Sequence, residues 1–124
     1  MSNAKYKDIH ERIFTFALAI LSITKEVSQT PENIILIKQF VRSATSIGAN
    51  AREADGAESK KEFIHKFTIA KKEAKETHYW LRLLLGHNPH LKSKLEILID
   101  ENMQLIAIIN KIIINAKSSV SNAK

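Results

Sequence analysis

Apolar residues recur every three or four positions in four separate segments of the chain, and polar residues fill the positions between them. Ile9, Ile13, Phe16 and Ile20 show this pattern in the first segment, where they fall on one side of a helix. No segment alternates apolar and polar residues as a half-buried strand does. The periodicity therefore predicts an all-α chain, with helices over about 5–28, 31–55, 60–85 and 89–117.

Short polar connections separate these segments and carry residues that start or end helices. Thr30 and Asn88 are suited to cap the second and fourth helices, because each has a side-chain oxygen and is followed by proline. Ser59 and Glu62 have the spacing of a capping box, and Gly56 is expected to close the second helix in a left-handed conformation. Helices of this length joined by short turns predict a single domain over residues 1–124, an antiparallel up-down-up-down four-helix bundle.

Small residues lie on one face of the second helix, where they allow another backbone to approach closely. Ala44, Gly48 and Ala51 are the helix-packing residues of this face. If the second and third helices fold back around the turn near Gly56, Gly48 meets Phe67 and large residues sit opposite small ones. The predicted core stripe of the second helix is Ile34, Ile37, Val41, Ala44, Gly48 and Ala51.

The same pairing of helices predicts polar contacts along their border. Arg42 falls near Glu73, and Asn50 falls near His65. We expect these contacts to fix the orientation of the two helices, as buried polar networks do. A role in binding a ligand is the alternative.

The fourth helix carries more large apolar residues than the roughly three positions in seven that one buried face requires. The residues predicted to fill the core near its end are Ile106, Ile109 and Ile113. A second ridge is then left over, formed by Leu105, Ile108 and Ile112. The first helix has a similar ridge outside its core stripe, formed by Phe14, Leu18 and Leu21. Exposed apolar ridges usually mark an interface, so the sequence predicts a homo-oligomer.

The chain has 124 residues and no cysteine, which excludes a disulfide framework and a thiolate zinc site and is typical of a reducing compartment. The apolar stretch "IFTFALAILSI" at 13–23 is shorter than the roughly 20 residues that a membrane span needs. We therefore expect a cytoplasmic protein without a membrane partner.

The formal net charge of +6 is concentrated in one region of the chain. Residues 59–86 hold seven Lys or Arg residues against three acidic residues, a balance of +4. This balance favours a polyanionic partner such as RNA or DNA, with a solvated helix face as the alternative. Tyr79 and Trp80 lie beside these cations and could stack on bases, although packing is the favoured interpretation for Trp80. The candidate nucleic-acid-binding residues are Lys66, Lys71, Lys72, Lys75 and Arg82.

The sequence contains no motif for catalysis or for a metal centre. Glu62 and His65 form one Glu-x-x-His pair, whereas carboxylate di-metal bundles use two such pairs and further glutamates. Nucleophile-elbow, phosphate-loop and dinucleotide signatures do not occur. We therefore expect no metal, no cofactor and no enzymatic activity. An enzyme with a composite site at subunit junctions is the least favoured alternative.

The segment "FVRSATSIGANAREADGAESKKEFIHKFTIAKKEAKETHYWLRLL" at 40–85 resembles a family of bacterial four-helix bundles that includes the 23S rRNA intervening sequence proteins. The resemblance rests on Arg-Ser-x-x-Ser-Ile-x-x-Asn at 42–50, Ser-x-x-Glu-Phe at 59–63 and Lys-Glu-Ala-x-Glu-Thr-x-Tyr-Trp-Leu at 72–81. One departure is Arg52, where an acidic residue is expected. The resemblance implies the bundle already predicted, a ring-forming homo-oligomer that is typically a pentamer, and no catalytic activity.

A related group comprises accessory proteins of diversity-generating retroelements, and this relation implies a nucleic-acid partner. The sequence thus favours a non-enzymatic, basic, homo-oligomeric module that binds RNA or DNA. A protein-interaction scaffold that binds no nucleic acid is the alternative.

Overall fold

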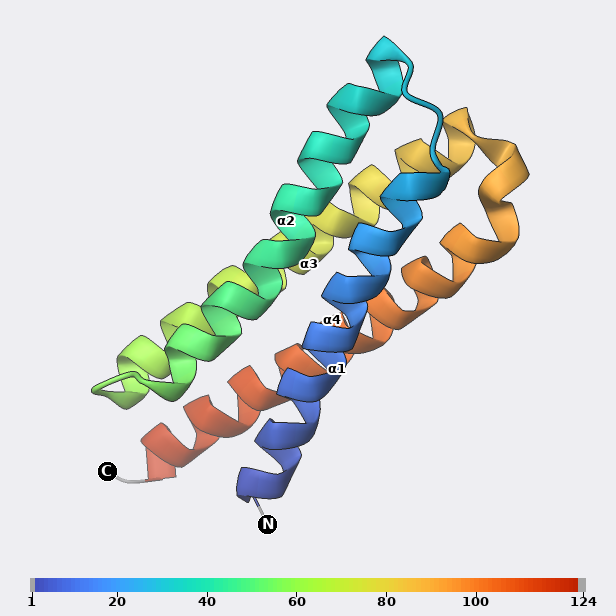
Figure 1. The fold of residues 1–124 in the computed structure, drawn as a ribbon. Helices are drawn as coiled ribbons and strands as arrows, with labels where there is room; N and C mark the ends of the chain where they lie inside the picture. Colours follow the sequence, from blue (N-terminus) through green and yellow to red (C-terminus); the bar gives the residue numbers. More distant parts are fainter. Residues whose placement is uncertain (1, 123–124) are drawn as a thin grey trace.

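The computed structural model describes residues 2–122, and the side chains of residues 9–118. Within this range the chain forms four α-helices, which are α1 Ser2–Ile23, α2 Pro31–Asp55, α3 Lys60–His87 and α4 Lys92–Asn122 (Figure 1). Two 3-10 turns, η1 Thr24–Glu26 and η2 Pro89–Leu91, lie between helices. The described residues contain no strand, and the predicted all-α four-helix bundle is confirmed.

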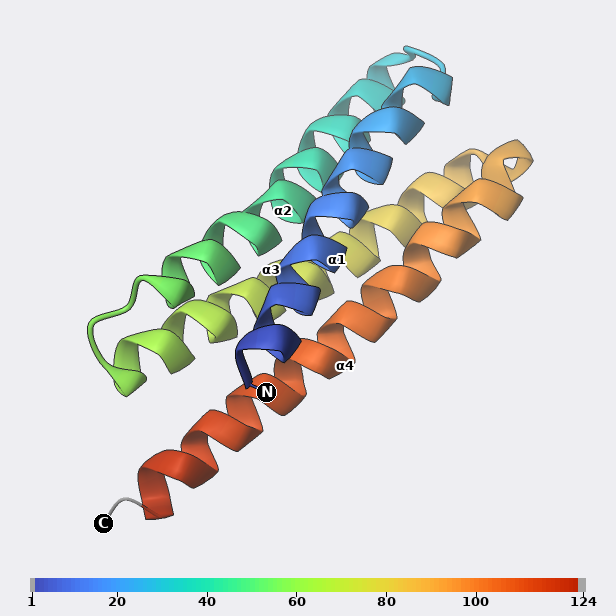
Figure 2. The ribbon, with the colours of Figure 1, turned by 60° about the horizontal axis from the view of Figure 1, so that its bottom comes forward.

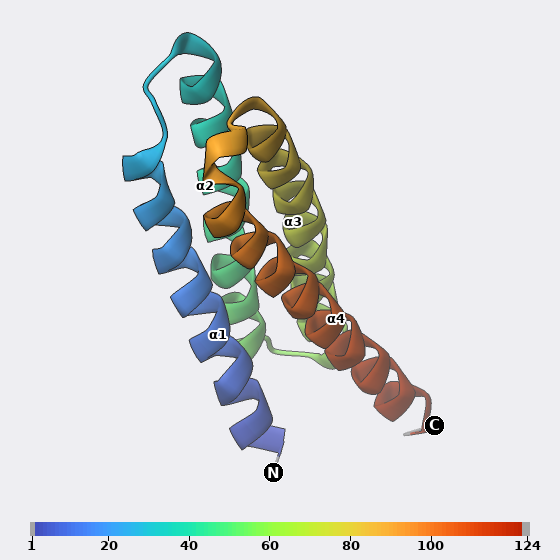
Figure 3. The ribbon, with the colours of Figure 1, turned by 90° about the vertical axis from the view of Figure 1, so that its right-hand side faces the viewer.

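The helices run alternately up and down, so both ends of the chain lie at the end of the bundle where α2 turns into α3 (Figures 1 and 2). The last turns of α4 extend past this connection (Figure 2). α1 packs against α2 on one side and α4 on the other, which places it diagonally opposite α3 (Figure 3).

Local side-chain hydrogen bonds explain where α2 and α3 begin. Thr30 Oγ1 accepts from the backbone N–H of Asn33 at 3.2 Å, and Ser59 Oγ accepts from that of Glu62 at 3.0 Å, so both predicted caps are confirmed. Gly56 has a φ of −94°, and the left-handed ending predicted for α2 is wrong. Its N–H instead bonds to the Glu53 carbonyl at 3.1 Å, a tightened last turn that needs no left-handed residue.

Asn88 does not cap α4 as predicted, because its side chain points into the core. Asn88 and Asn33 exchange hydrogen bonds of 3.0 and 2.8 Å between their amide groups, and they are only 4% and 2% exposed. The backbone after Asn88 first forms the 3-10 turn η2, so α4 starts at Lys92. A buried amide pair thus joins the start of α2 to the end of α3.

The core face of α4 is wider than the predicted one and includes two residues that were assigned to an outward ridge. Leu105 is 0% and Ile112 is 3% exposed, so their assignment to an outward ridge is wrong, while Ile108 and Ile106 are partly buried at the edge of the core. The buried residues of η2 and α4 are Leu91, Leu95, Leu98, Asn102, Leu105, Ile109, Ile112, Ile113 and Ala116, so Ile109 and Ile113 fill the core as predicted. Apart from Ile113, these positions alternate four and three residues apart, the spacing of a heptad seam. Isoleucines surround this part of α4, so hydrophobicity alone could not indicate which side faces inward.

The core face of α2 is rotated in the same way. Ala44 and Ala51 are fully buried, but Ile34 is 38% exposed and Gly48 lies at the border of the core. The buried residues of α2 are Asn33, Phe40, Ser43, Ala44, Ile47, Ala51 and Ala54. Two of these, Asn33 and Ser43, are polar, and a periodicity of apolar residues does not select them.

Polar pairs join α2 to α3 along most of their length. We call these pairs the α2–α3 ladder; they are Asn33–Asn88, Arg42–Glu76, Ser43–Thr77 and Glu53–Lys66. The Ser43–Thr77 hydroxyl pair is buried, with its oxygens 2.8 Å apart. The ladder is displaced by about one helical turn from the predicted pairing.

The displaced pairing changes the neighbour of Gly48. A Cβ atom at Gly48 would lie 3.1 Å from Cγ2 of Ile13, with no other contact within 4 Å. The prediction that Gly48 packs against Phe67 is therefore wrong. Gly48 instead permits the close approach of α1 to α2.

Candidate nucleic-acid interface

One face of α3 presents a row of exposed side chains along nearly the whole helix. The row lies opposite the buried face of α3, and its members are spaced alternately by four and three residues. We call it the α3 row; it comprises Lys61, His65, Thr68, Lys72, Lys75, Tyr79 and Arg82, all of them exposed. From Lys61 to Arg82 it extends about 32 Å at a rise of 1.5 Å per residue. Four cations therefore lie on one straight edge of the bundle.

The row contains three of the five candidate nucleic-acid-binding residues. No salt bridge among the described residues engages Lys72, Lys75 or Arg82, whose side chains lie in solvent. The fourth cation, Lys61, was missed, although its spacing from Lys72 places both on one helix face. The charge pattern thus identifies the correct helix but omits one of the four cations of the α3 row.

Lys66 and Lys71 lie on the flanks of α3, where each side chain has a partner on a neighbouring helix. Lys66 Nζ lies 2.6 Å from Glu53 Oε1, and the hydrogen bond and charge of this glutamate raise the pKa of Lys66. Lys71 Nζ donates to Asn110 Oδ1 at 2.7 Å, and its side chain is partly buried. Both ammonium groups are thus engaged within the bundle.

Two of the acidic residues of α3, Glu73 and Glu76, are held on the side of α3 that faces α2. Arg42 Nη2 donates to Glu76 at 2.8 Å, and Arg42 Nη1 lies 3.6 Å from Glu73, the neighbour that the sequence indicated. The hydrogen bond and charge of Glu76 raise the pKa of Arg42 above its usual value. These carboxylates are partly buried beside α2, so the outer face of α3 keeps its positive charge.

The other predicted polar contact takes a different form. Asn50 Nδ2 donates to the Ser46 carbonyl of its own helix at 2.8 Å, and His65 belongs to the exposed α3 row. The one-turn displacement of the two helices separates the positions that were expected to meet. Asn50 therefore does not hold α3 in place through His65.

Tyr79 is the tyrosine of the α3 row, and 57% of it is exposed. Its ring meets that of Trp80 edge to face, with centroids 5.3 Å apart and an interplanar angle of 70°. Trp80 packs against the core, as the sequence favoured. The Trp80 indole thus contacts the ring of Tyr79 from the core side, and Tyr79 projects into solvent beside the cations of the α3 row.

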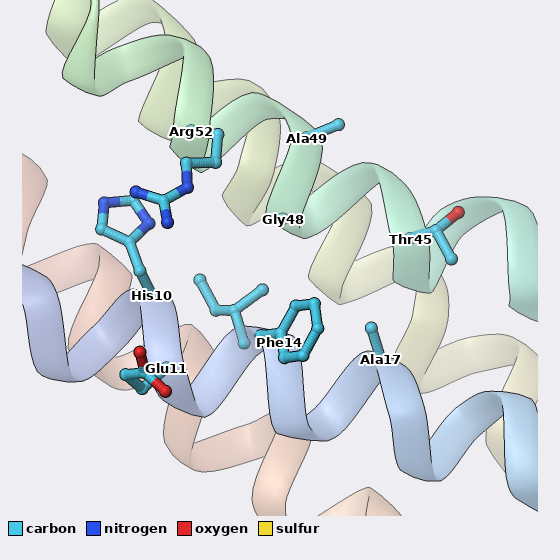
Figure 4. Close-up of a pocket in the computed structure, with 9 residues that line it drawn as sticks. His10, Glu11, Phe14, Ala17, Thr45, Gly48, Ala49 and Arg52 are labelled. Carbon is cyan, nitrogen blue, oxygen red and sulfur yellow. The ribbon is translucent and has the colours of Figure 1, made fainter.

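A groove of about 470 Å³ lies between α1 and α2, a size within the range of small-molecule sites (Figure 4). Its apolar lining includes Ile13, Phe14 and Gly48, whose missing side chain deepens it. Charges of both signs surround one end: His10, Glu11 and Arg52 line it, and Asp55 Oδ2 lies 2.9 Å from His10 Nε2. Because these charges offset one another, the lining does not select a cationic or an anionic ligand.

An apolar ridge runs along α1 beside this groove. Phe14, Leu18 and Leu21 are 64%, 51% and 45% exposed. They follow each other at helical spacing, so their side chains form one continuous strip. Of the two ridges proposed from the sequence, this one lies on the surface of the chain.

The described residues include no group of three or more His, Asp or Glu side chains placed to hold a metal ion. No helix of the described residues has the length and hydrophobicity needed to cross a membrane. The chain belongs to the class of antiparallel four-helix bundles, with a basic outer edge along α3.

Comparison with known proteins identifies the family within this class. The chain belongs to the 23S rRNA-intervening sequence protein family, whose family model matches residues 5–111. A solved structure from Bacteroides thetaiotaomicron VPI-5482, described as a protein with unknown function from the S23 ribosomal protein family, is 35% identical with a TM-score of 0.81. The match covers 88% of this chain and 97% of that one. Among curated proteins there is no significant match.

The family expected from the segment at 40–85 is therefore confirmed, over a longer part of the chain than the motifs themselves cover. The relation to retroelement accessory proteins remains a prediction.

Proposed function

We propose that this protein is a non-enzymatic, homo-oligomeric module of the cytoplasm that binds RNA or DNA through the α3 row. The observation that carries the proposal is the alignment of Lys61, Lys72, Lys75 and Arg82 on one exposed face without carboxylates among them. Cations in such a row neutralise successive phosphates and release bound counterions. The net charge of +6 strengthens the attraction at longer range.

The salt dependence of binding tests this proposal. Fluorescence anisotropy of a labelled RNA should show affinity that falls linearly with salt on a logarithmic plot, with a slope of about −0.7 to −0.9 per phosphate contacted. Lys72→Gln should make the slope less steep by about one such unit. Absence of binding to RNA and DNA at about 50 mM salt would contradict the proposal.

Lys66 provides a matched control, because Lys66→Gln and Lys72→Gln remove the same formal charge from the same helix. The Lys66 ammonium is engaged by Glu53, whereas that of Lys72 is exposed. We therefore expect Lys66→Gln to leave the slope unchanged. An equal loss in both variants would mean that total charge, and not the α3 row, determines binding.

We also propose that the chains assemble through the α1 ridge of Phe14, Leu18 and Leu21, with five subunits as the number expected from the family resemblance. The ridge supports this assembly because a contiguous apolar strip in water usually marks an interface. Head-to-tail contacts that close on themselves generate a ring.

Light scattering after gel filtration measures the assembly directly. A pentamer would have about five times the 14.0 kDa mass of one chain. Leu18→Glu should shift the protein to a smaller mass without loss of helical circular dichroism. A monomer at micromolar concentration would contradict the assembly, and a dimer would contradict only the ring.

A protein-interaction scaffold is the second candidate function, and the same apolar ridge favours it. In that case Phe14, Leu18 and Leu21 contact a different protein, and the α3 row keeps the complex in solution. A chain that is monomeric and binds neither RNA nor DNA would favour this candidate. Nucleic-acid binding that depends on Lys72 would exclude it as the main function.

A further inference from the structure

We propose that Tyr79 makes the α3 row selective for unpaired nucleotides, because its ring stacks on one base while the flanking cations hold the phosphates. This inference rests on the proposed function and adds the class of nucleic acid. The preferred ligand is single-stranded or looped, and a regular duplex lacks the contact that Tyr79 offers.

The position of Tyr79 within the row supports base stacking. Lys75 precedes it by four residues and Arg82 follows it by three, so cations flank the ring at about 6 and 4.5 Å along the helix axis. A basic surface with an aromatic ring at its centre is the common arrangement in proteins that bind single strands. Tyr79 is the only phenylalanine, tyrosine or tryptophan of the row, and His65 lies 14 residues before it.

The support beneath Tyr79 favours a fixed stacking platform. The edge-to-face contact with Trp80 restrains the tyrosine ring, and Trp80 itself packs against the core. Such a contact engages one part of the ring, and 57% of the residue stays accessible. A restrained ring loses little conformational freedom when a base stacks on it.

The geometry of the bundle disfavours a duplex as the partner of this ring. α2 and α4 pack against α3 on its two sides, so α3 cannot enter a groove as an isolated recognition helix does. In a duplex the base faces are stacked on each other, and the major groove of double-stranded RNA is too narrow for side chains to read. Tyr79 would then meet only the sugar-phosphate backbone.

The experiment compares one RNA strand in two forms. Fluorescence anisotropy is measured at low salt with a labelled, unstructured 12-nucleotide RNA and with the same strand annealed to its complement. Tyr79→Ala should weaken binding of the single strand by about 5- to 150-fold, the range for loss of one stacked base. Binding of the duplex should be unchanged, and Tyr79→Phe should restore single-strand binding.

Two further variants separate stacking from other roles of Tyr79. Leu83→Ala removes a neighbouring exposed side chain, 40% accessible, and should leave both affinities unchanged. Tyr79→Leu keeps a large apolar side chain without a ring, so it should behave as Tyr79→Ala if stacking matters. Tyr79→Leu also replaces Tyr79→Ala in the binding measurement if the alanine variant does not fold.

Each outcome decides the inference. Equal loss for strand and duplex, or no loss for the single strand in either ring-deleting variant, would overturn it while leaving the proposed function intact, provided Lys72→Gln still weakens binding. Absence of binding to both RNA forms by the unaltered protein would overturn the proposed function and this inference together.

Discussion

The buried amide pair between Asn33 and Asn88 should contribute strongly to the free energy of unfolding. It forms the end of the α2–α3 ladder that lies farthest from the connection at Gly56. The pair exchanges two hydrogen bonds, and each amide also donates to a backbone carbonyl, of Ser28 and of Leu84 respectively. Both side chains are almost fully buried, so water does not replace a lost partner. Substitution of either residue therefore leaves polar groups unsatisfied inside the protein.

The magnitude follows from these contacts. Asn88→Ala removes both bonds to Asn33 and leaves Asn33 Oδ1 without a donor, while Asn33 Nδ2 keeps the Ser28 carbonyl. Each buried hydrogen bond contributes about 0.5 to 1.5 kcal/mol, and a buried group left unsatisfied costs about 1 to 3 kcal/mol. We expect Asn88→Ala to lower the free energy of unfolding by about 2 to 4 kcal/mol. Asn33→Ala should have a similar effect.

A double-mutant cycle measured by urea denaturation tests the pairing itself. Each single substitution already breaks the shared bonds, so the double variant should lose less than the sum, by about 1 to 3 kcal/mol. Protein concentration must be equal throughout, since assembly affects apparent stability. Asn115→Ala on the exposed face of α4 is the control and should stay within about 0.5 kcal/mol of the unaltered chain. Additive effects would refute the reasoning, because they would mean that the two amides act independently.

Gly48→Leu should lower the free energy of unfolding by about 1 to 3 kcal/mol in denaturant melts, since its first added carbon lies 3.1 Å from the Ile13 methyl group. An unchanged free energy of unfolding would contradict this prediction, because it would mean that α1 can move away from α2 without cost. Leu105→Ala should cost about 2 to 5 kcal/mol, whereas Ile114→Ala, at a position 56% exposed on the same helix, should change little; equal effects would contradict the core face assigned to α4. The hydrogen bond and charge of its glutamate partner raise the pKa of Lys66. The contribution of this ion pair is therefore complete from neutral pH up to the unfolded pKa of about 10.4 and declines as pH rises through the higher folded value. The melting-temperature difference between the unaltered chain and Lys66→Met should accordingly be constant from neutral pH to about pH 10 and disappear above it, and a difference that vanishes near neutral pH would contradict this.

The sequence was sufficient for the helices and the caps at Thr30 and Ser59, because these depend on local spacing and local hydrogen bonds. It was insufficient for the rotation of α2 and α4 about their axes. In α2 the polar residues Asn33 and Ser43 are buried only because Asn88 and Thr77 meet them from another helix. In α4 the run of isoleucines offers no contrast between the two sides. In both helices the buried face depends on contacts with neighbouring helices, and the sequence of one helix alone does not show these contacts.

The candidate interface divides in the same way. Lys72, Lys75 and Arg82 could be selected from charge alone. Charge alone does not distinguish Lys66 and Lys71 from them, since their partners on α2 and α4 are far away along the chain. The alternating spacing of four and three residues was the available signal, and applied to α3 it separates the exposed row from its flanks.

Along the α2–α3 ladder the separation in sequence increases with distance from the connection between the two helices. It is 13 residues for Glu53 and Lys66, 34 for Arg42 and Glu76, and 55 for Asn33 and Asn88. Formation of the pair nearest the connection shortens the loop that the next pair must close, which reduces the entropy lost at each step. Contacts formed in this order favour fast folding.

We therefore expect α2 and α3 to join first, from the Gly56 connection outward, and α1 and α4 to dock on the finished hairpin. Substitutions at the Glu53–Lys66 pair should then slow folding, whereas substitutions at the Asn33–Asn88 pair should mainly accelerate unfolding. Stopped-flow kinetics that gave the opposite assignment would contradict this order. With the expected order, a chain emerging during synthesis has its basic edge in place before its last helix is complete.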